Sequence, residues 1–110
     1  MKFINLTGHE VHEANSNTIF PATKIKMTVH MRTIKSKIDG ITVKNPIIIG
    51  LQNYLLPQEQ EGIAYIVPNL VANAIYGRKD IYSPGTVIRV NGNPTSCNGL
   101  RHRYNEYPVN

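Results

Sequence analysis

The sequence predicts an α+β domain in which a mostly antiparallel β-sheet curls toward a small barrel and carries one short helix. Three observations support this class. Short runs rich in β-branched residues recur along the chain, two pairs of them flank Asp-Gly or Asn-Gly turns, and a single segment has helical spacing. The 110 residues suit one domain. We expect residues 1–100 to form that domain and residues 101–110 to be a polar C-terminal tail.

The clearest strand signal lies at residues 24–33, where polar and apolar side chains alternate. One face of this strand should hold the apolar side chains of Ile25, Met27, Val29 and Met31. The other face should be basic, with Lys24, Lys26, Thr28, His30 and Arg32. Residues 34–38 and 41–43 then flank Asp39-Gly40, which supplies the positive φ angles of a tight hairpin turn. The apolar run 46–50 predicts a fully buried strand or a strand bent at Gly50.

The second half of the chain predicts one helix between strands. Residues 64–67 have the composition of a strand, and a helix should follow at about 69–76. Pro68 suits a first helical turn, and Gly77 suits the left-handed residue that follows a last turn. The helix should pack on the sheet through one apolar stripe, formed by Leu70, Val71, Ala74 and Ile75. Residues 86–90 and 94–97 flank Asn91-Gly92 and predict a second hairpin.

The formal net charge of +5 is unevenly distributed along the chain. Residues 24–44 carry a net charge of +5 and residues 78–110 carry +3, whereas residues 1–23 carry −1 and residues 45–77 carry −2. Two basic blocks would form an anion-binding face if the fold brings them together. The alternative is a solvated strand face and a charged tail.

Composition excludes several classes of protein. A hydrophobic fraction of 41% is too high for a disordered chain, and a single cysteine excludes a disulfide scaffold and a multi-cysteine metal site. Polar residues follow the N-terminal methionine closely, and apolar runs stay short of the ~18 residues that a spanning helix needs. We therefore expect a cytoplasmic protein with no membrane partner.

Motifs for catalysis are weak. His9 and His12 lie three residues apart in the densest cluster of chemically able side chains, whereas the zinc-protease motif places two histidines four apart on a helix. Cys97 follows a strand, where a small buried residue is the simpler interpretation. We expect no metal, no cofactor and no catalytic residue, although an enzyme that uses His9, His12 or Cys97 stays open as an alternative.

The segment after the expected helix has the composition of a ligand loop. Arg78, Asp80, Tyr82 and Ser83 offer a guanidinium, a carboxylate, a phenol and a hydroxyl, and Gly85 adds backbone flexibility. The alternative is a structural Arg78–Asp80 ion pair next to a helix end. The chain also has six tyrosines, whose rings stack on nucleobases but are equally at home in strands.

A series of short motifs runs through the chain in a fixed order: Asn5-Leu6-Thr7-Gly8-His9, Tyr65-Ile66-Val67-Pro68 with Val71, Ala72 and Ala74, Arg78-x-Asp80, Ser83-Pro84-Gly85, Val87-x-Arg89, Gly92 and Cys97-x-Gly99-Leu100. Together they resemble a family of small phage and bacterial proteins that open with Asn-Leu-Thr-Pro-His and carry Tyr-Ile-Val-Ser, Arg-x-Asp, Pro-Gly, Val-Arg and Gly-Cys-x-Gly. This sequence has Gly8 where the family has Pro and Pro68 where it has Ser. The resemblance spans residues 5–100 and implies a phage or prophage origin, and for a phage-encoded protein the expected location is the host cytoplasm.

Small phage proteins without catalytic motifs often act by binding, and one class resembles molecular sponges that sequester cyclic nucleotide or cyclic ADP-ribose signals of bacterial immunity. The leading expectation is a non-enzymatic, homo-oligomeric sponge of this kind. Phosphates would be held by Arg78, Arg89 and Arg32, a base or hydroxyl contact would come from Tyr82, and polar contacts would come from Asp80, Ser83, Asn5, Thr7 and His9. The alternative is a nucleic-acid or host-protein binding module that uses the basic strand 24–33.

Overall fold

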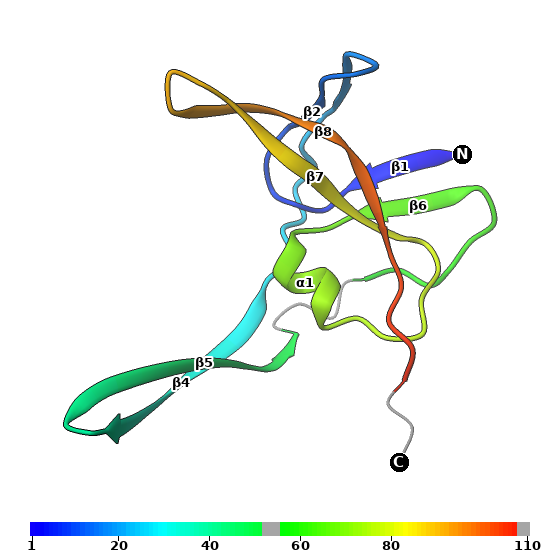
Figure 1. The fold of residues 1–110 in the computed structure, drawn as a ribbon. Coiled ribbons are helices and arrows are strands. Elements are labelled where there is room, and N and C mark those ends of the chain that lie inside the picture. The colour runs from blue at the N-terminus through cyan, green and yellow to red at the C-terminus, as the bar shows by residue number, and fades with distance from the viewer. Residues whose placement is uncertain (52–55, 108–110) are drawn as a thin grey trace.

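The computed structural model describes residues 1–51 and 56–107 (Figure 1). Their strands are β1 (Lys2–Asn5), β2 (Val11–Glu13), β3 (Thr18–Phe20), β4 (Val29–Ile38), β5 (Ile41–Leu51), β6 (Ile63–Ile66), β7 (Ile81–Val90) and β8 (Asn93–Arg103), and helix α1 spans Asn69–Asn73. Within these ranges the strands form a six-stranded sheet in the order β1-β6-β7-β8-β2-β3 and a separate two-stranded sheet, β4-β5. The predicted class, α+β with a curled sheet and a short helix, is confirmed.

The six-stranded sheet curls until its two edges almost meet. The longest pairing, β7 with β8, is antiparallel, as is β2 with β3, whereas β1–β6, β6–β7 and the short β2–β8 contact are parallel. The edge strands β1 and β3 are joined through a side chain, because Asn5 Nδ2 donates to the Phe20 carbonyl at 3.0 Å. This bond nearly closes the sheet into a barrel.

Two hydrophobic clusters lie on opposite faces of the sheet, because Tyr65 and Ile66 are neighbours in β6 and neighbouring side chains point to opposite faces. The outer cluster lies under α1 and is formed by Leu6, Met27, Tyr65, Val67, Val71, Ala72, Ile75 and Ile81. The inner cluster draws on five strands of the barrel and is formed by Val11, Ile66 and Cys97, with Phe3, Phe20 and Leu100 packed against them. The sheet is therefore covered on both faces.

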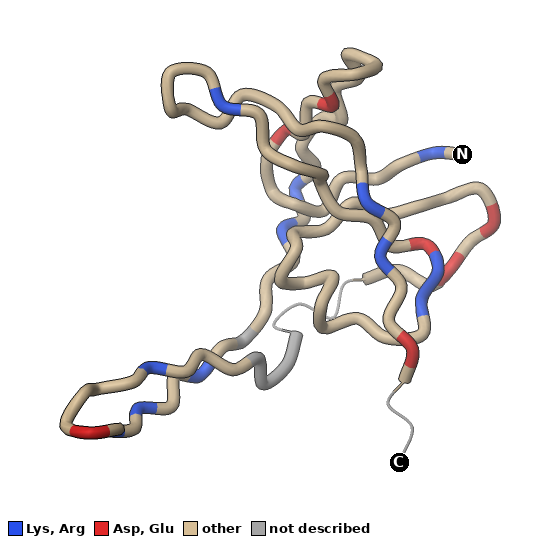
Figure 2. Tube along the Cα trace, viewed as in Figure 1, with Lys and Arg blue, Asp and Glu red and all other residues tan. Residues whose placement is uncertain are grey.

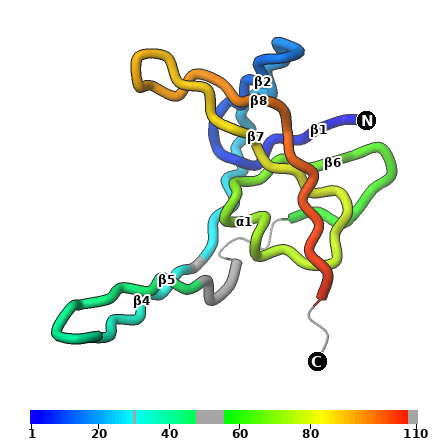
Figure 3. Tube along the Cα trace, viewed as in Figure 1, coloured from blue at the N-terminus to red at the C-terminus, as the bar shows by residue number. Residues whose placement is uncertain are grey.

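Both predicted hairpin turns are confirmed. Asp39 and Gly40 have φ angles of 51° and 80°, and Asn91 and Gly92 have 52° and 81°, as a two-residue turn between twisted strands requires. The first turn joins β4 to β5 in a hairpin, the arm, that extends away from the barrel (Figures 1 and 3).

The predicted strand 24–33 is wrong in its first half. Strand β4 begins at Val29, and the preceding residues contribute an isolated bridge between Lys26 and Thr7. Met27 is fully buried in the outer cluster, whereas Met31 on the arm is 46% exposed, so the expected apolar face is split between two environments. The backbone N–H of Met27 donates to the Leu6 carbonyl, which ties this segment to the barrel before the arm begins.

The run 46–50 lies in β5 on the arm, and it is not a fully buried strand because Pro46 is exposed. The pairing of β4 with β5 shifts register between His30 and Met31, next to the position where Gly50 pairs with His30. This irregularity fits the alternative prediction of a strand that bends at Gly50.

Helix α1 is shorter than the predicted 69–76, because the chain after it is held by the C-terminal segment. Asn105 Nδ2 donates to the carbonyls of Ala72 and Ile75 at 2.8 Å each, and the Gly77 N–H donates to the Asn105 carbonyl. Strand β8 itself runs to Arg103, three residues into the expected tail. Within the described ranges, no helix has the length and apolar character needed to cross a membrane.

A buried carboxylate fixes the β2–β3 turn to β8. Glu13 accepts hydrogen bonds from the Ser16 side chain, from the backbone N–H groups of Asn15 and Ser16 at 2.8 and 2.7 Å, and from the Gly99 N–H at 3.0 Å. These bonds, led by the Ser16 hydroxyl, lower the pKa of Glu13 from 4.5 to about 2. The ionised form therefore stabilises the folded protein.

We expect the stability of the protein to fall as the pH is lowered from about 4.5 to about 2, because the unfolded chain takes up a proton at Glu13 before the folded protein does. A Glu13→Gln variant should melt at a lower temperature at neutral pH and lose less stability across this window, so that the two melting temperatures converge near pH 2. Thermal denaturation followed by circular dichroism measures both curves. Parallel curves would contradict the role given to Glu13.

Candidate functional site

Arg78 and Asp80 form a structural clamp. Arg78 Nε donates to Asp80 Oδ1 at 2.9 Å, and Nη2 donates to Asp80 Oδ2 and to the Pro57 carbonyl, both at 2.7 Å. Glu59 lies 3.4 Å from Nε. The hydrogen bonds to Asp80 raise the pKa of Arg78 above its ordinary value. The guanidinium thus joins the segment before β6 to the segment after α1, with most of its donors used inside the protein.

The side chains of Asn5 and Thr7 also form hydrogen bonds within the protein. Both are 2% exposed, and Asn5 Oδ1 accepts from the Thr7 N–H at 2.9 Å and from the Thr7 hydroxyl at 2.6 Å. Asn5 Nδ2 donates to the His9 carbonyl at 2.7 Å, in addition to its bond across to β3. His9 itself is exposed, with Nδ1 3.0 Å from the Glu10 carbonyl. Asn5 and Thr7 build the turn that carries His9.

The remaining predicted site residues do not converge on one place: Tyr82 and Ser83 are neighbours in β7 with side chains on opposite faces, and Arg89 and Arg32 lie elsewhere. Tyr82 packs between the rings of Phe3 and His102, with centroids 5.2 and 4.8 Å away. Ser83 is fully buried and accepts from Arg103 at 3.2 Å. Arg89 is exposed near the β7–β8 turn, and Arg32 lies on the arm. The nine residues are therefore spread over several places, and the structure does not bring them together in one pocket.

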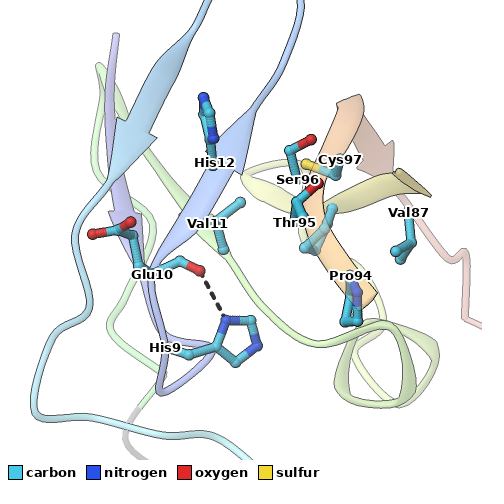
Figure 4. A pocket seen from close by; sticks show the side chains of 10 residues that line it. His9, Glu10, Val11, His12, Val87, Pro94, Thr95, Ser96 and Cys97 are labelled. Atoms are coloured by element: carbon cyan, nitrogen blue, oxygen red, sulfur yellow. Dashed lines mark hydrogen bonds between the residues drawn. The ribbon is translucent and has the colours of Figure 1, made fainter. Parts of the chain in front are cut away.

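A cavity of about 390 Å³ lies between the segment around β2 and the β7–β8 hairpin (Figure 4). It is lined by His9, Glu10, Val11, His12, Pro84, Val87, Pro94, Thr95, Ser96 and Cys97. The cavity brings together the two histidines and the cysteine singled out in the sequence, and the buried Cys97 thiol donates to the Gly99 carbonyl. The described lining residues include neither Lys nor Arg, so this cavity suits an apolar ligand better than a phosphate.

Groups of three or more side chains able to hold a metal ion do not occur among the residues that the structure describes. The same part of the chain contains no buried side-chain nitrogen or oxygen that lacks a hydrogen-bond partner. Among the described residues, the interior of the barrel therefore presents no unsatisfied polar side chain to a ligand.

The arm carries three lysines of the basic block 24–44 that the sequence did not assign to a common face. Lys35 pairs directly with Lys44, and Lys37 pairs with Thr42, so all three lysines share one face of the β4–β5 ribbon with Thr33. All are exposed. Figure 2 shows basic positions along the arm and an acidic position at its tip, where the β4–β5 turn contains Asp39. We call Lys35, Lys37 and Lys44 the basic face.

The basic face has an unfavourable electrostatic arrangement in the free protein. Lys35 and Lys44 stand opposite one another, and like charges on opposed positions of two strands repel. An anion between them would relieve this repulsion. Arg32, which was expected on the basic face of strand 24–33, lies on the other face of the ribbon from Lys35, because the two residues are three positions apart in β4 and alternate residues face opposite ways. If residues are paired outward from the Asp39-Gly40 turn, the sequence alone predicts that Lys35 and Lys44 share one face and that Arg32 lies on the other.

Comparison with protein-family models, with curated proteins and with solved structures finds no match for this chain.

Proposed function

We propose that the protein binds the phosphate backbone of a nucleic acid through the basic face of the arm. The main support is the pair of opposed lysines, Lys35 and Lys44, with Lys37 beside them, on a two-stranded ribbon that extends away from the barrel. A two-stranded ribbon fits the major groove of duplex DNA, and lysines along it neutralise phosphates. This is the binding module that the sequence analysis kept as an alternative, with its basic surface moved from residues 24–33 to residues 33–44.

Salt dependence tests this proposal because each neutralised phosphate releases a counterion. We expect the association constant for a labelled 20-base-pair duplex, measured by fluorescence anisotropy, to fall with salt between about 50 and 200 mM with a log–log slope of about −3. Replacing Lys35, Lys37 and Lys44 with Gln should weaken binding at least about tenfold at the lower salt concentration and flatten the slope toward zero.

A matched control removes the same charge elsewhere. Lys2, Lys24 and Lys79 are replaced with Gln in one variant, which changes the net charge by the same amount but leaves the basic face intact. We expect this variant to keep most of the affinity and the slope of the unaltered protein. Equal losses in the two variants would show general charge attraction and overturn the proposal, as would a failure of the unaltered protein to bind at low salt.

A nucleotide-derived small anion, the leading expectation from the sequence, is a second candidate. One observation favours it: opposed Lys35 and Lys44 side chains can both reach a single phosphate group. Against it, Arg78, Asp80, Asn5 and Thr7 are engaged inside the protein. Calorimetry with cyclic dinucleotides, cyclic trinucleotides and cyclic ADP-ribose isomers separates the candidates. A heat of binding that the Lys35→Gln variant loses would support the small anion. No heat of binding with any compound of the panel would rule the small anion out.

A further inference from the structure

The face of the arm opposite the lysines is apolar and exposed. The pairing places Ile34, Ser36 and Ile38 of β4 on this face, opposite Asn45, Val43 and Ile41 of β5. Ile34, Ile38 and Ile41 are 46%, 60% and 67% exposed. An isolated two-stranded ribbon is marginally stable in water, and a contiguous exposed apolar surface marks an interaction site. We therefore expect another protein surface to cover this apolar face.

We infer that the cover is the arm of a second copy of this chain, packed face to face about a two-fold axis. This inference stands apart from the proposed function, because it concerns the apolar face and the nucleic acid would contact the basic face. An isologous contact requires one surface that complements itself, and the arm has such a surface.

The self-complementarity has two parts. With the two-fold axis at Ser36, Ile34 of one copy lies against Ile38 of the other, since the two residues are equally distant from Ser36 along β4. The same operation brings Arg32 level with the Asp39-Gly40 turn of the other copy, about 13 Å on either side of the axis. Arg32 shares the apolar face, and Asp39 stands exposed at the tip. Opposite charges thus meet at both ends of an apolar centre.

A nucleic acid or a small anion is a poor occupant of this face, because both are polar and charged, while the face offers mainly isoleucine and valine side chains, with Ser36 and Asn45 between them and Arg32 at its base. The antiparallel packing of two arms also leaves both basic faces directed outward. The inferred dimer therefore buries the apolar faces and keeps all six lysines available to solvent.

Sedimentation velocity over protein concentrations of about 1 to 100 µM tests the inference. We expect the unaltered full-length protein to reach the mass of two chains. Replacing Ile34, Ile38 and Ile41 with Thr keeps the preference for strand structure and should raise the dimer dissociation constant at least about 100-fold. As a matched control, Ile19, Ile88 and Val90 are exposed β-branched residues outside the arm, and their replacement with Thr should leave the dimer unchanged.

A double-mutant cycle tests the predicted pairing of charges. Arg32→Gln and Asp39→Asn should each weaken the dimer several-fold, and the double variant should be no weaker than either single one, because each change removes the same contact. Asn is suited to the positive φ of position 39, so the turn is kept. A monomer at every concentration, a dimer that survives the arm substitutions, or fully additive charge variants would each overturn the inference.

Discussion

Gly85→Ala is expected to destabilise the protein by about 3 kcal/mol or more, the largest effect we anticipate for a single methyl group. A Cβ atom at this position would lie 2.2 Å from the Asn98 carbonyl oxygen and 2.8 Å from the Gly99 carbonyl oxygen. Both atoms are backbone and cannot rotate away. Strands β7 and β8 would have to separate where β8 also reaches toward β2, through the bond from the Ala14 N–H to the Cys97 carbonyl.

Gly62→Ala is the matched control for this prediction. Gly62 has a φ of +77° and open space around its would-be Cβ, so alanine there adds backbone strain of about 1 kcal/mol without a clash. Urea denaturation followed by circular dichroism gives the free energy of unfolding of both variants. A cost at Gly85 no greater than that at Gly62 would contradict the close approach of β7 and β8.

Asn5→Ala is expected to lower the free energy of unfolding by about 3 kcal/mol, because it removes the side chain that joins the edge strands β1 and β3. The change removes the donor to the Phe20 and His9 carbonyls and the acceptor for the Thr7 N–H, and Asn5 and Thr7 are buried. Leaving buried polar groups unpaired costs about 1–3 kcal/mol each, partly recovered if water enters. Thr23→Val removes the hydroxyl that donates to the Asn5 carbonyl at 2.7 Å and accepts from the Ile25 N–H at 3.3 Å, and it should cost about 1 kcal/mol in the same urea measurement.

Asn5→Asp sharpens the test by exchanging the donor for an acceptor. One carboxylate oxygen would replace Nδ2 and face the carbonyls of Phe20 and His9, so repulsion and burial should raise the pKa of the new carboxyl group. Because a protonated acid can donate, we expect the stability deficit relative to the unaltered protein to shrink as the pH is lowered from 7 to about 5. A deficit that is independent of pH would contradict the donor role of Asn5.

Local chemistry explains what the sequence could predict of the fold. The two hairpins depend on Asp39-Gly40 and Asn91-Gly92, whose conformational preferences act within four residues, and both turns form as expected. The same holds for the start of α1 after Pro68. Its early end depends on Asn105, more than 30 residues away, which periodicity within a short window does not contain.

Non-local pairing explains the parts of the fold that the sequence did not predict. The parallel pairs of β1 with β6 and β6 with β7 join segments whose residues carry no local mark of their partner, and the burial of Met27 depends on Leu6. At the candidate site, the sequence left a ligand loop and a structural Arg78–Asp80 ion pair as alternatives, and the fold shows the ion pair. The grouping of Lys35 with Lys44 was accessible in principle, because it follows from the hairpin register alone.

The position of the arm in the chain bears on how this protein can change. Strands β4 and β5 lie between β3 and β6 in sequence, yet the six-stranded sheet is ordered without them. Residues can therefore be added to or removed from the arm in pairs, one from each strand, without shifting the register of any barrel strand. The length and the charge pattern of the arm can therefore change, while the residues that stabilise the barrel stay under separate constraint.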